Sequence, residues 1–401
     1  MTSRRTFFIS TLTSLEALAA AKSANLEMRV AKRDFRGLTR EDLPTPCMIL
    51  DLDLFEKNLK HMATHCKTNN LQLRGHVKIH KSTEIAKRQV ALGAIGVTVA
   101  TVAEAELMSG AGIKGVLLTS NAAGKEKTAR AIAIARRDPT FAAVADDPAM
   151  IDQFNAAAGA AGCKLNLVVD VYAGLTRHGC QPGEPAMELV RKTLASKNLN
   201  FRGLMAYSGT ASHTKNWQSR RERSRADLAG MLETAEMCRK AGIEVPIRTG
   251  GSTGTYNIDV GALTELQAGS YMFMDTGYIK IGGRNNDALY DDFAQSLTIL
   301  TTVISKRHNG QATIDCGIKG MIKETDTVKG RPDMKVAAQG AEYGLLKWAE
   351  GAPDLKLGDK MELYPTHLDS TTNVYDRYYV AKGENIVDAW SVMGRAGAAQ
   401  R

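Results

Sequence analysis

Alternation between short apolar runs and amphipathic helical stretches is the feature that most constrains the fold of this chain. From residue 45 onward, apolar runs rich in β-branched residues alternate with helical stretches. A short strand at 47–50 and a helix at 54–66 come first, and eight further strand-like runs follow, with helical text between most of them. Strands that alternate with helices form a parallel sheet with helices on its faces. Eight such strands in succession close into a barrel. The expected strands are 71–79, 96–101, 115–120, 141–145, 165–171, 203–208, 245–249 and 266–271.

The pattern changes after about residue 290. Strand-like runs at 296–305, 312–316, 360–363 and 377–380 follow one another without long helices between them. We therefore expect an α/β chain with a (β/α)8 TIM-type barrel over residues 45–290 and a mainly-β domain over 291–401. Residues 36–44 are expected to pack on that second domain.

The N-terminus, residues 1–35, has the character of a leader. The run from Ser3 to Phe8 reads SRRTFF, and an apolar stretch and Ala-rich text follow it. This pattern resembles a bacterial twin-arginine export signal. It predicts a periplasmic location, and a cytoplasmic protein with a chance arginine pair is the alternative.

Charge and hydropathy exclude two classes of partner. The 401-residue chain carries a net charge of +9, and its basic residues are scattered or grouped in short clusters such as 215–225. A nucleic-acid-binding protein would need a basic stripe with stacking aromatics. No apolar run approaches the roughly 18–20 residues that span a bilayer. We expect a small-molecule substrate, and neither nucleic acid nor membrane as a partner.

A lysine marks the end of the first expected barrel strand, in the segment RGHVKIHKS at 74–82. A lysine that leaves the end of a barrel strand points into the mouth, where TIM-barrel sites lie. Cationic neighbours favour the neutral amine, which is the form that makes a Schiff base. Lys78 is therefore a candidate for a covalent link to a cofactor, and an ordinary basic turn is the alternative.

Two segments rich in Gly, Ser and Thr indicate a phosphate site. The seventh strand runs into RTGGSTGTY at 248–256, and the eighth ends at Gly269-Ser270-Tyr271. Glycines let backbone N–H groups approach an anion, and hydroxyl groups add donors. The loops after strands seven and eight of a barrel commonly hold a phosphate. The two segments together therefore indicate phosphate more strongly than either does alone.

Other polar side chains follow strands five and six and the second domain. Arg177 and Tyr207 fall at strand ends, with His213 close behind, so all three are expected at the barrel mouth. In the second domain His367 and Asp369 are two residues apart, and in an extended segment they would face the same side. Imidazole and carboxylate together suit Mn²⁺ or Mg²⁺, and a chance H-x-D pair is the alternative.

Five segments, taken in order, resemble the D-threonine aldolase/D-serine dehydratase-like group of pyridoxal-phosphate (PLP) enzymes, which are built on the alanine-racemase-type barrel (fold type III). They are LPTPCMILDLDLFEKNL, RGHVKIHKS, AYSGTASH, TGGSTGTY followed by ELQAGSYMFMD, and PTHLDSTTNVYD. They cover nearly everything from about residue 40 to the end.

The resemblance implies the role of each candidate. Lys78 would hold PLP, Arg177 would approach the ring oxygen, and Tyr207 would lie at the pyridine ring. His367 and Asp369 would bind a divalent metal, with Mn²⁺ first and Mg²⁺ or Zn²⁺ as alternatives, and His213 would lie near the substrate hydroxyl. The phosphate would be surrounded by Gly250, Gly251, Ser252, Thr253, Gly254 and Ser270, and Tyr271 is assigned to the same cofactor site.

The resemblance also implies an activity. A His and Asp metal pair looks like the aldolases, whereas His and Cys looks like the D-serine dehydratases. We therefore expect a homodimeric lyase that cleaves D-threonine to glycine and acetaldehyde. The alternatives are a dehydratase acting on D-serine, D-threonine or 3-hydroxyaspartate, a racemase, and, in another class, a non-catalytic PLP-binding protein.

Two positions, one segment and the export-like leader depart from the family pattern. Gly75 stands where the family usually has Pro, and Tyr343, in the segment AEYG, stands where a His is usual. The segment AGLTRHG, which contains Arg177, matches only loosely. These departures bear on the substrate more than on the cofactor.

Overall fold

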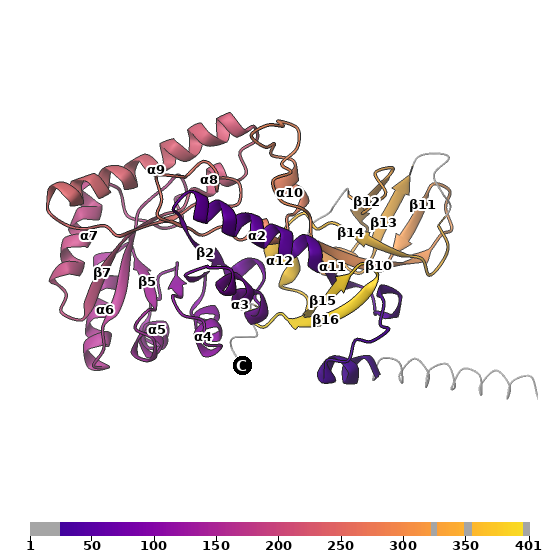
Figure 1. Cartoon of the computed structure of the whole chain (residues 1–401), viewed down its shortest axis with the longest axis horizontal. Coiled ribbons are helices and arrows are strands. Elements are labelled where there is room, and N and C mark those ends of the chain that lie inside the picture. The colour runs from indigo at the N-terminus through magenta and orange to yellow at the C-terminus, as the bar shows by residue number, and fades with distance from the viewer. Residues whose placement is uncertain (1–24, 322–326, 349–354, 396–401) are drawn as a thin grey trace, which may run out of the picture.

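The computed structural model describes residues 25–321, 327–348 and 355–395, and it shows a closed barrel beside a mainly-β domain (Figure 1). Eight parallel strands pair in chain order, and the last pairs with the first, so the expected barrel is confirmed. The strands are β2 (Gln72–His76), β3 (Gly96–Val99), β4 (Leu117–Leu118), β5 (Ala142–Ala145), β6 (Leu165–Asp170), β7 (Leu199–Ala206), β8 (Ile247–Gly250) and β9 (Glu265–Leu266).

Helices surround the barrel, and each buries one face against its neighbours. The helix after β3 begins at Thr101, whose hydroxyl accepts from the backbone of Glu104, and the helix after β5 begins at Asp147 followed by Pro148. The longer helices are α2 (Leu52–Thr68), α3 (Thr83–Ala91), α4 (Val102–Gly110), α5 (Lys125–Arg137), α6 (Pro148–Ala160), α7 (Glu184–Ala195) and α9 (Trp217–Lys240). Short helices α8 (Gly209–Ser212) and α10 (Thr276–Ile279) lie in the loops at the barrel mouth.

The core has two layers in the barrel. Side chains that point inward from neighbouring strands form a small cluster of their own, which contains Leu117, Val144, Val168 and Met205. A much larger cluster fills the space between the strands and the surrounding helices. The strand ends are therefore held by packing from both sides, which makes the mouth a rigid frame for side chains.

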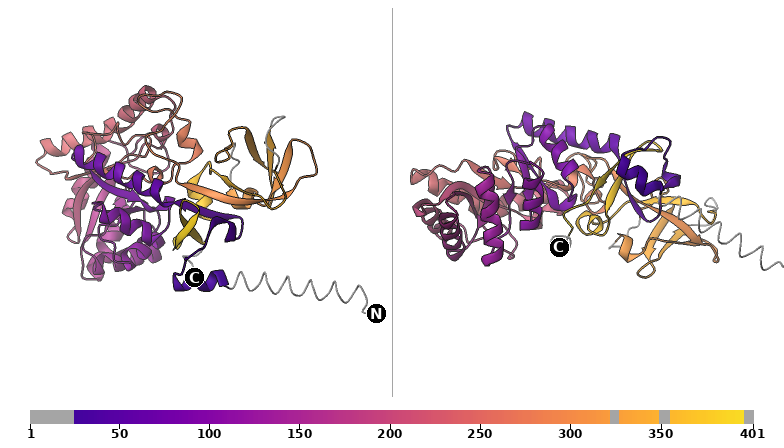
Figure 2. Two further views of the ribbon diagram at one scale, coloured as in Figure 1. Left: turned by 45° about the vertical axis from the view of Figure 1, so that its right-hand side comes forward. Right: turned by 90° about the horizontal axis from the view of Figure 1, so that it is seen from below.

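The second domain is an eight-stranded sheet in the order β12-β13-β11-β10-β1-β15-β16, with β14 paired to β10. Figure 2 shows it beside the barrel in two further views. Its strands are β1 (Cys47–Asp51), β10 (Leu297–Ser305), β11 (Gln311–Ile314), β12 (Met334–Ala338), β13 (Gly344–Trp348), β14 (Lys360–Leu363), β15 (Arg377–Lys382) and β16 (Asn385–Ser391). Two short helices, α11 (Ile318–Met321) and α12 (Leu368–Thr372), interrupt it.

Strand β1 corrects the expected start of the barrel at residue 45. It pairs antiparallel with β10 and parallel with β15, in the middle of the C-terminal sheet. Met48, Ile49 and Leu50 are fully buried, so this strand needs cover on both faces, which a central position supplies. Just before it, Leu38 and Leu43 pack against Tyr379 and other apolar residues of this sheet.

Two expected strands at the mouth end earlier than the apolar pattern predicted. The first stops at His76, and Val77–Ile79 form a 3-10 turn, η2. The eighth stops at Leu266, and Ser270–Met272 form another, η3. Lys78 and Ser270 therefore lie on turns that follow the strands rather than on the strands themselves.

The expected export signal at Ser3–Phe8 lies outside the described residues, so the periplasmic location stays a prediction. Among the residues that the structure describes, no helix is long and apolar enough to cross a membrane.

Candidate active site

A cavity of about 480 Å³ opens at the C-terminal ends of the barrel strands, and residues of both domains line it. The barrel supplies most of the lining, and the β domain adds the segment from His367 to Asp369. The predicted residues that line this cavity are Lys78, Arg177, Tyr207, His213, Gly251, Ser252, Thr253, Ser270, His367 and Asp369.

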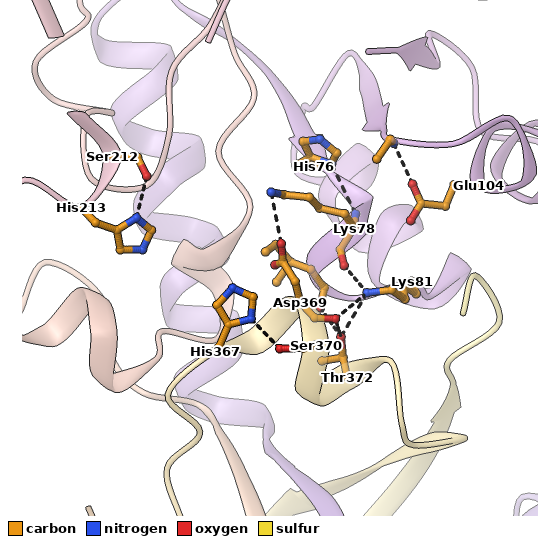
Figure 3. Close-up of polar contacts among 12 residues, drawn as sticks. His76, Lys78, Lys81, Glu104, Ser212, His213, His367, Asp369, Ser370 and Thr372 are labelled. Atoms are coloured by element: carbon orange, nitrogen blue, oxygen red, sulfur yellow. Dashed lines mark hydrogen bonds and ion pairs between the residues drawn. The ribbon is translucent and has the colours of Figure 1, made fainter. Parts of the chain in front are cut away.

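Lys78 lies in the turn η2 and points into the cavity (Figure 3). Its Nζ is 3.2 Å from Oδ2 of Asp369, and about a third of each side chain is exposed. The backbone N–H of Lys78 donates to Nδ1 of His76 at 3.3 Å. Burial, helped by the nearby charge of Lys78, holds the pKa of His76 well below its usual value. A neutral imidazole therefore accepts from the backbone of the lysine.

The loops after β8 and β9 form one wall of the cavity and are tied to each other. The backbone N–H of Tyr271 donates to Oγ1 of Thr253 at 2.8 Å. At Gly254 an added Cβ would lie 2.1 Å from the carbonyl oxygen of Ser212, and at Gly250 it would lie 1.9 Å from that of Ala206. These two glycines do not line the cavity. They allow the close backbone packing that places the cavity-lining residues between them.

The side chain of Tyr271 does not belong to this cavity. It is fully buried, and its hydroxyl accepts from Nε2 of Gln89 at 2.9 Å, behind the barrel wall. The prediction that Tyr271 contacts a cofactor is therefore wrong for its side chain. Sequence alone could not show this, because the turn η3 replaces the expected strand and changes the direction of the side chain.

Arg177 and Tyr207 lie together at the ends of β6 and β7. The guanidinium carbon of Arg177 is 5.7 Å from the centre of the Tyr207 ring, a distance at which a cation is attracted to an aromatic face. The pair places a positive charge at the side of the cavity formed by strands five and six of the barrel.

His367 and Asp369 reach the cavity from the β domain, but not on an extended segment. His367 is the residue before α12, and Asp369 lies in the first turn of that helix. The expectation that an extended segment places them on one face is wrong in its cause. A helix start brings both side chains to the same cavity (Figure 3). Nδ1 of His367 lies 2.6 Å from Oγ of Ser370, which orients the ring.

His213 lies across the same space from Lys78 and His367 (Figure 3). Its Nδ1 is 2.8 Å from Oγ of Ser212, and its ring packs on Tyr278 with centroids 4.2 Å apart. Burial, together with the charges of His367 and Lys78, lowers the pKa of His213 to about 4. The imidazole is therefore neutral near pH 7 and able to accept a proton.

Comparison with known proteins agrees with this geometry. Residues 50–277 match the family described as "Alanine racemase, N-terminal domain", and residues 296–381 match "Putative serine dehydratase domain". The chain is 32% identical to the 3-hydroxy-D-aspartate aldolase of Paracoccus denitrificans (strain Pd 1222), over 90% of this chain and 94% of that one.

Solved structures show the same likeness. The D-threonine aldolase of Filomicrobium marinum superposes with a TM-score of 0.84 at 32% identity, over 90% of this chain and 98% of that one. The D-threo-3-hydroxyaspartate dehydratase of Delftia sp. HT23 superposes with a TM-score of 0.78 at 26% identity, over 88% and 98%.

This chain belongs to the D-threonine aldolase/D-serine dehydratase-like family of fold type III PLP enzymes. It is a PLP-dependent lyase. The resemblance drawn from the five sequence segments is thereby confirmed, and a non-catalytic PLP-binding protein is no longer a competing interpretation.

The cavity of the lyase fits PLP. It presents a primary amine at Lys78, a wall of hydroxyl groups and glycine backbone, and a guanidinium at Arg177. Gly269 lets the wall close against the lysine turn, since a Cβ there would lie 3.0 Å from the carbonyl oxygen of His76. An anionic, ring-shaped cofactor with a carbonyl group matches these features.

The metal pair also fits a divalent cation by its donor types, although it is incomplete. No group of three His, Cys, Asp or Glu side chains in the described part of the chain is arranged to hold a metal. One imidazole and one carboxylate leave room for water or substrate oxygens, as Mn²⁺ and Mg²⁺ prefer. The metal therefore stays a prediction.

Two lining residues were missed from the sequence. Nδ1 of His178 bonds Oδ2 of Asp170 at the end of β6, and burial raises the pKa of that carboxyl. Asp275 caps α10, accepting from the backbone of Tyr278 at 2.9 Å, and burial raises its pKa to about 6. His178 lies within AGLTRHG, directly after Arg177, and Asp275 is the last residue of ELQAGSYMFMD, so position after a strand was the available signal.

The structure explains the departure from the family pattern at Gly75, and it shows that the departure at Tyr343 lies outside the cavity. At Gly75 a Cβ would lie 2.3 Å from Nε2 of Gln89, so this position makes room for the buried amide that bonds Tyr271. Tyr343 is half exposed just before β13 and does not line the cavity.

Proposed function

We propose that this lyase carries out metal-dependent retro-aldol cleavage of D-β-hydroxy-α-amino acids, with D-threonine giving glycine and acetaldehyde. The observation that carries the proposal is the contact between Lys78 and Asp369, with His367 and His213 around the same space. The cofactor lysine and the predicted metal ligands thus share one cavity although they come from different domains.

Each residue has a part in this scheme. Lys78 is the amine that attaches the cofactor, and the Gly251–Ser252–Thr253 wall with Ser270 holds its phosphate. Arg177 and Tyr207 orient the ring from the opposite side. PLP supplies an electron sink for the pair released from the Cα–Cβ bond, and a divalent metal at His367 and Asp369 would act as a Lewis acid on the β-hydroxyl.

His213 is the proposed general base. Its neutral imidazole accepts the β-hydroxyl proton as the C–O bond becomes the aldehyde carbonyl and the Cα–Cβ bond breaks. A proton then returns to Cα, and glycine is formed. Because His213 is held by Ser212 and Tyr278, it stays at the edge of the cavity that faces the metal pair.

The family leaves two further possibilities for the substrate and the reaction. The relative from Paracoccus denitrificans acts on 3-hydroxy-D-aspartate, so that acid is a second candidate substrate. The Delftia relative is a dehydratase. In that reaction Lys78 would remove the α-proton and hydroxide would leave, giving a 2-oxo acid and ammonia. The resemblance associates a His and Asp pair with the aldolases, so the carboxylate at position 369 supports cleavage over dehydration.

One incubation tests these possibilities together. Purified protein with added PLP is given D-threonine, L-threonine or D-3-hydroxyaspartate, each with Mn²⁺ or with a chelator. Glycine and an aldehyde from the D-isomers alone, lost on chelation, is the expected result. A 2-oxo acid with ammonia would point to the dehydratase, and activity that survives chelation would refute the metal.

A variant tests the metal pair directly. Asp369→Ala is expected to lose the Mn²⁺ dependence together with most of the activity, while the visible absorbance of bound PLP persists. Asp376→Ala is the control, because Asp376 lies beyond α12 and does not line the cavity. Wild-type kinetics in Asp369→Ala would remove Asp369 from the scheme.

The homodimer stays a prediction from the resemblance. Sedimentation of the purified protein would test it, and a monomer at all concentrations with full activity would contradict it.

A further inference from the structure

A second lysine lies three residues after Lys78, and no role has been assigned to it so far. Lys81 is buried, with 6% of its surface exposed, and its backbone has φ of +51°. That left-handed conformation is unfavourable for a residue with a side chain, and it persists only where the surroundings require it. A buried ammonium group likewise needs partners.

The amine of Lys81 joins the two halves of the active site (Figure 3). Its Nζ donates to the backbone carbonyl of Lys78 and, at 3.0 Å, to the backbone carbonyl of Asp369. It also lies 3.4 Å from Oγ1 of Thr372, at the end of α12. One nitrogen atom thus contacts the main chain of the cofactor lysine and the main chain of a proposed metal ligand.

The surroundings fix this amine in place. The carboxylates of Asp369 and of the buried Glu104 both act to stabilise its charge, and Glu104 is itself held by the backbone N–H of Ala100 at 2.7 Å. The carbonyl of Lys81 accepts from the backbone N–H of Met393 at 2.8 Å. The residue is therefore anchored at its side chain by α12 and at its backbone by the end of the chain.

Neighbouring bonds between the domains support the same turn without touching both site residues. Oγ1 of Thr372 donates to the carbonyl of Ile79 at 3.0 Å, and the hydroxyl of Tyr378 donates to that of His80 at 2.7 Å. Lys81 differs from these because its partners are Lys78 and Asp369 themselves.

We propose that Lys81 is a positioning residue that sets the separation between Lys78 and the helix carrying His367 and Asp369. Because the chain between these two elements runs through the whole barrel, local structure cannot set that separation. Direct hydrogen bonds from Lys81 to both elements can set it. The inference rests on the proposed function, both for the metal pair and for Lys78 as the residue that attaches PLP.

The test compares Lys81→Met with a matched variant. Methionine keeps most of the apolar stem and removes every donor. Lys360 is the control, since its Nζ, like that of Lys81, donates to backbone carbonyls. Its partners are the carbonyls of Arg40, Glu41 and Leu43, at 3.3, 2.5 and 2.9 Å. Those partners do not line the cavity. Lys360→Met thus loses the same kind of bond far from the chemistry.

Three measurements separate a positioning role from simple support of the fold. They are the Mn²⁺ dissociation constant from the electron paramagnetic resonance of free Mn²⁺, the visible absorbance of bound PLP, and kcat and KM for D-threonine at saturating cofactor and metal. Loss of a residue that orients a ligand costs roughly 10- to 100-fold in metal affinity or activity. We expect a loss of this size in Mn²⁺ affinity and kcat for Lys81→Met, with PLP absorbance retained.

For Lys360→Met we expect a lower Tm and unchanged Mn²⁺ affinity and kcat. Lys81→Gly, which suits the backbone conformation but lacks the amine, should be as defective as Lys81→Met. Normal activity in Lys81→Gly would show that only the backbone matters and would overturn the proposal. If Lys81→Met does not fold, Thr372→Val, which removes one acceptor of Lys81 together with the bond to Ile79, should show a smaller loss of the same kind, and wild-type behaviour there would count against the proposal.

The outcomes distinguish this inference from the proposed function. A wild-type protein that binds no Mn²⁺ and cleaves no D-β-hydroxy-amino acid would refute the function and the inference together. An active, Mn²⁺-dependent wild type with Lys81→Met equal to Lys360→Met would refute the inference alone.

Discussion

Two sides of the same cavity are built in different ways. The proposed phosphate side, formed by Gly251, Ser252, Thr253 and Ser270, comes from two loops of the barrel that follow neighbouring strands. The proposed metal side, formed by His367 and Asp369, comes from the start of a five-residue helix of the other domain and the residue just before it. The first is fixed by close backbone packing, whereas the second depends on how the two domains meet.

The difference teaches where each side is vulnerable. Glycines at the phosphate side tolerate no added atom, so small substitutions there should act through the backbone. At the metal side, Oγ of Ser370 contacts Nδ1 of His367, and Lys81 donates to the backbone carbonyl of Asp369. Substitutions there should alter metal binding and leave the cofactor in place.

The largest effect is expected at Lys78, which lies between the two sides. Lys78→Ala should lose the visible absorbance of attached PLP and fall below detectable turnover, because no other side chain is proposed to attach the cofactor. Absorbance spectra and a glycine-release assay would check this. Retained absorbance and turnover would show that Lys78 does not attach the cofactor. The comparison between a phosphate side and a metal side would then no longer hold.

Gly254→Ala should break the phosphate side selectively. The new Cβ would meet the carbonyl of Ser212 at 2.1 Å, so the loop must move. A displacement of about 1 Å can cost about 100-fold in activity, and we expect a loss of this order with weaker PLP retention and an unchanged Mn²⁺ requirement.

The control for this variant is Gly110→Ala at the end of α4, where an added Cβ meets no atom within 4 Å. Equal losses of activity in the two variants would show that close backbone packing does not maintain the phosphate side.

Ser370→Ala should weaken the metal side and leave the phosphate side unchanged. Its hydroxyl lies 2.6 Å from Nδ1 of His367, and removal of a group that orients a ligand costs roughly 10- to 100-fold in metal affinity. A titration of activity with Mn²⁺ should shift by about this factor, with the PLP absorbance unchanged. An unshifted titration would mean that Ser370 does not orient the imidazole.

Gly75→Ala tests the wall behind the phosphate side. Its Cβ would lie 2.3 Å from Nε2 of Gln89, whose amide bonds the buried Tyr271. Overpacking of this kind costs about 1–3 kcal/mol of the free energy of unfolding, which urea denaturation would measure. Adding Gln89→Ala should recover part of the loss, and failure to recover any would place the strain elsewhere.

The last effect concerns the pH dependence of stability and not the activity, and it is expected at Asp259, beneath the phosphate loop. Burial raises the pKa of this carboxyl to about 6, with Oγ of Ser224 donating to it at 2.6 Å. The stability that its proton provides is full below the unfolded pKa of 3.8 and is lost as pH rises through about 6. The change is on the order of 3 kcal/mol at most.

Asp259→Asn should remove that dependence. Its stability relative to the wild type should grow between about pH 4 and pH 7 and then level off, as thermal unfolding at a series of pH values would show. A constant difference across this range would mean that Asp259 does not titrate as its burial implies.

The barrel could be predicted because its signal is local. Eight apolar runs each encode a buried strand, and hydrophobic burial closes them into a ring whichever loops join them. The site residues at strand ends followed from the same pattern, which is why Lys78, Arg177 and Tyr207 all line the cavity. Tyr271 failed for the same reason, since the strand ends at Leu266, five residues earlier than expected, and the turn that follows directs its side chain out of the site.

The sequence by itself determined the order of strands and helices, the family, and the residue types at the mouth, because these depend on short-range periodicity and on motifs that stand intact in one segment. Only the tertiary structure decided that β1 belongs to the far sheet, that His367 and Asp369 start a helix beside Lys78, and that Lys81 joins them. Contacts between residues almost 300 positions apart arise from packing of whole domains, and no local pattern in the chain encodes them.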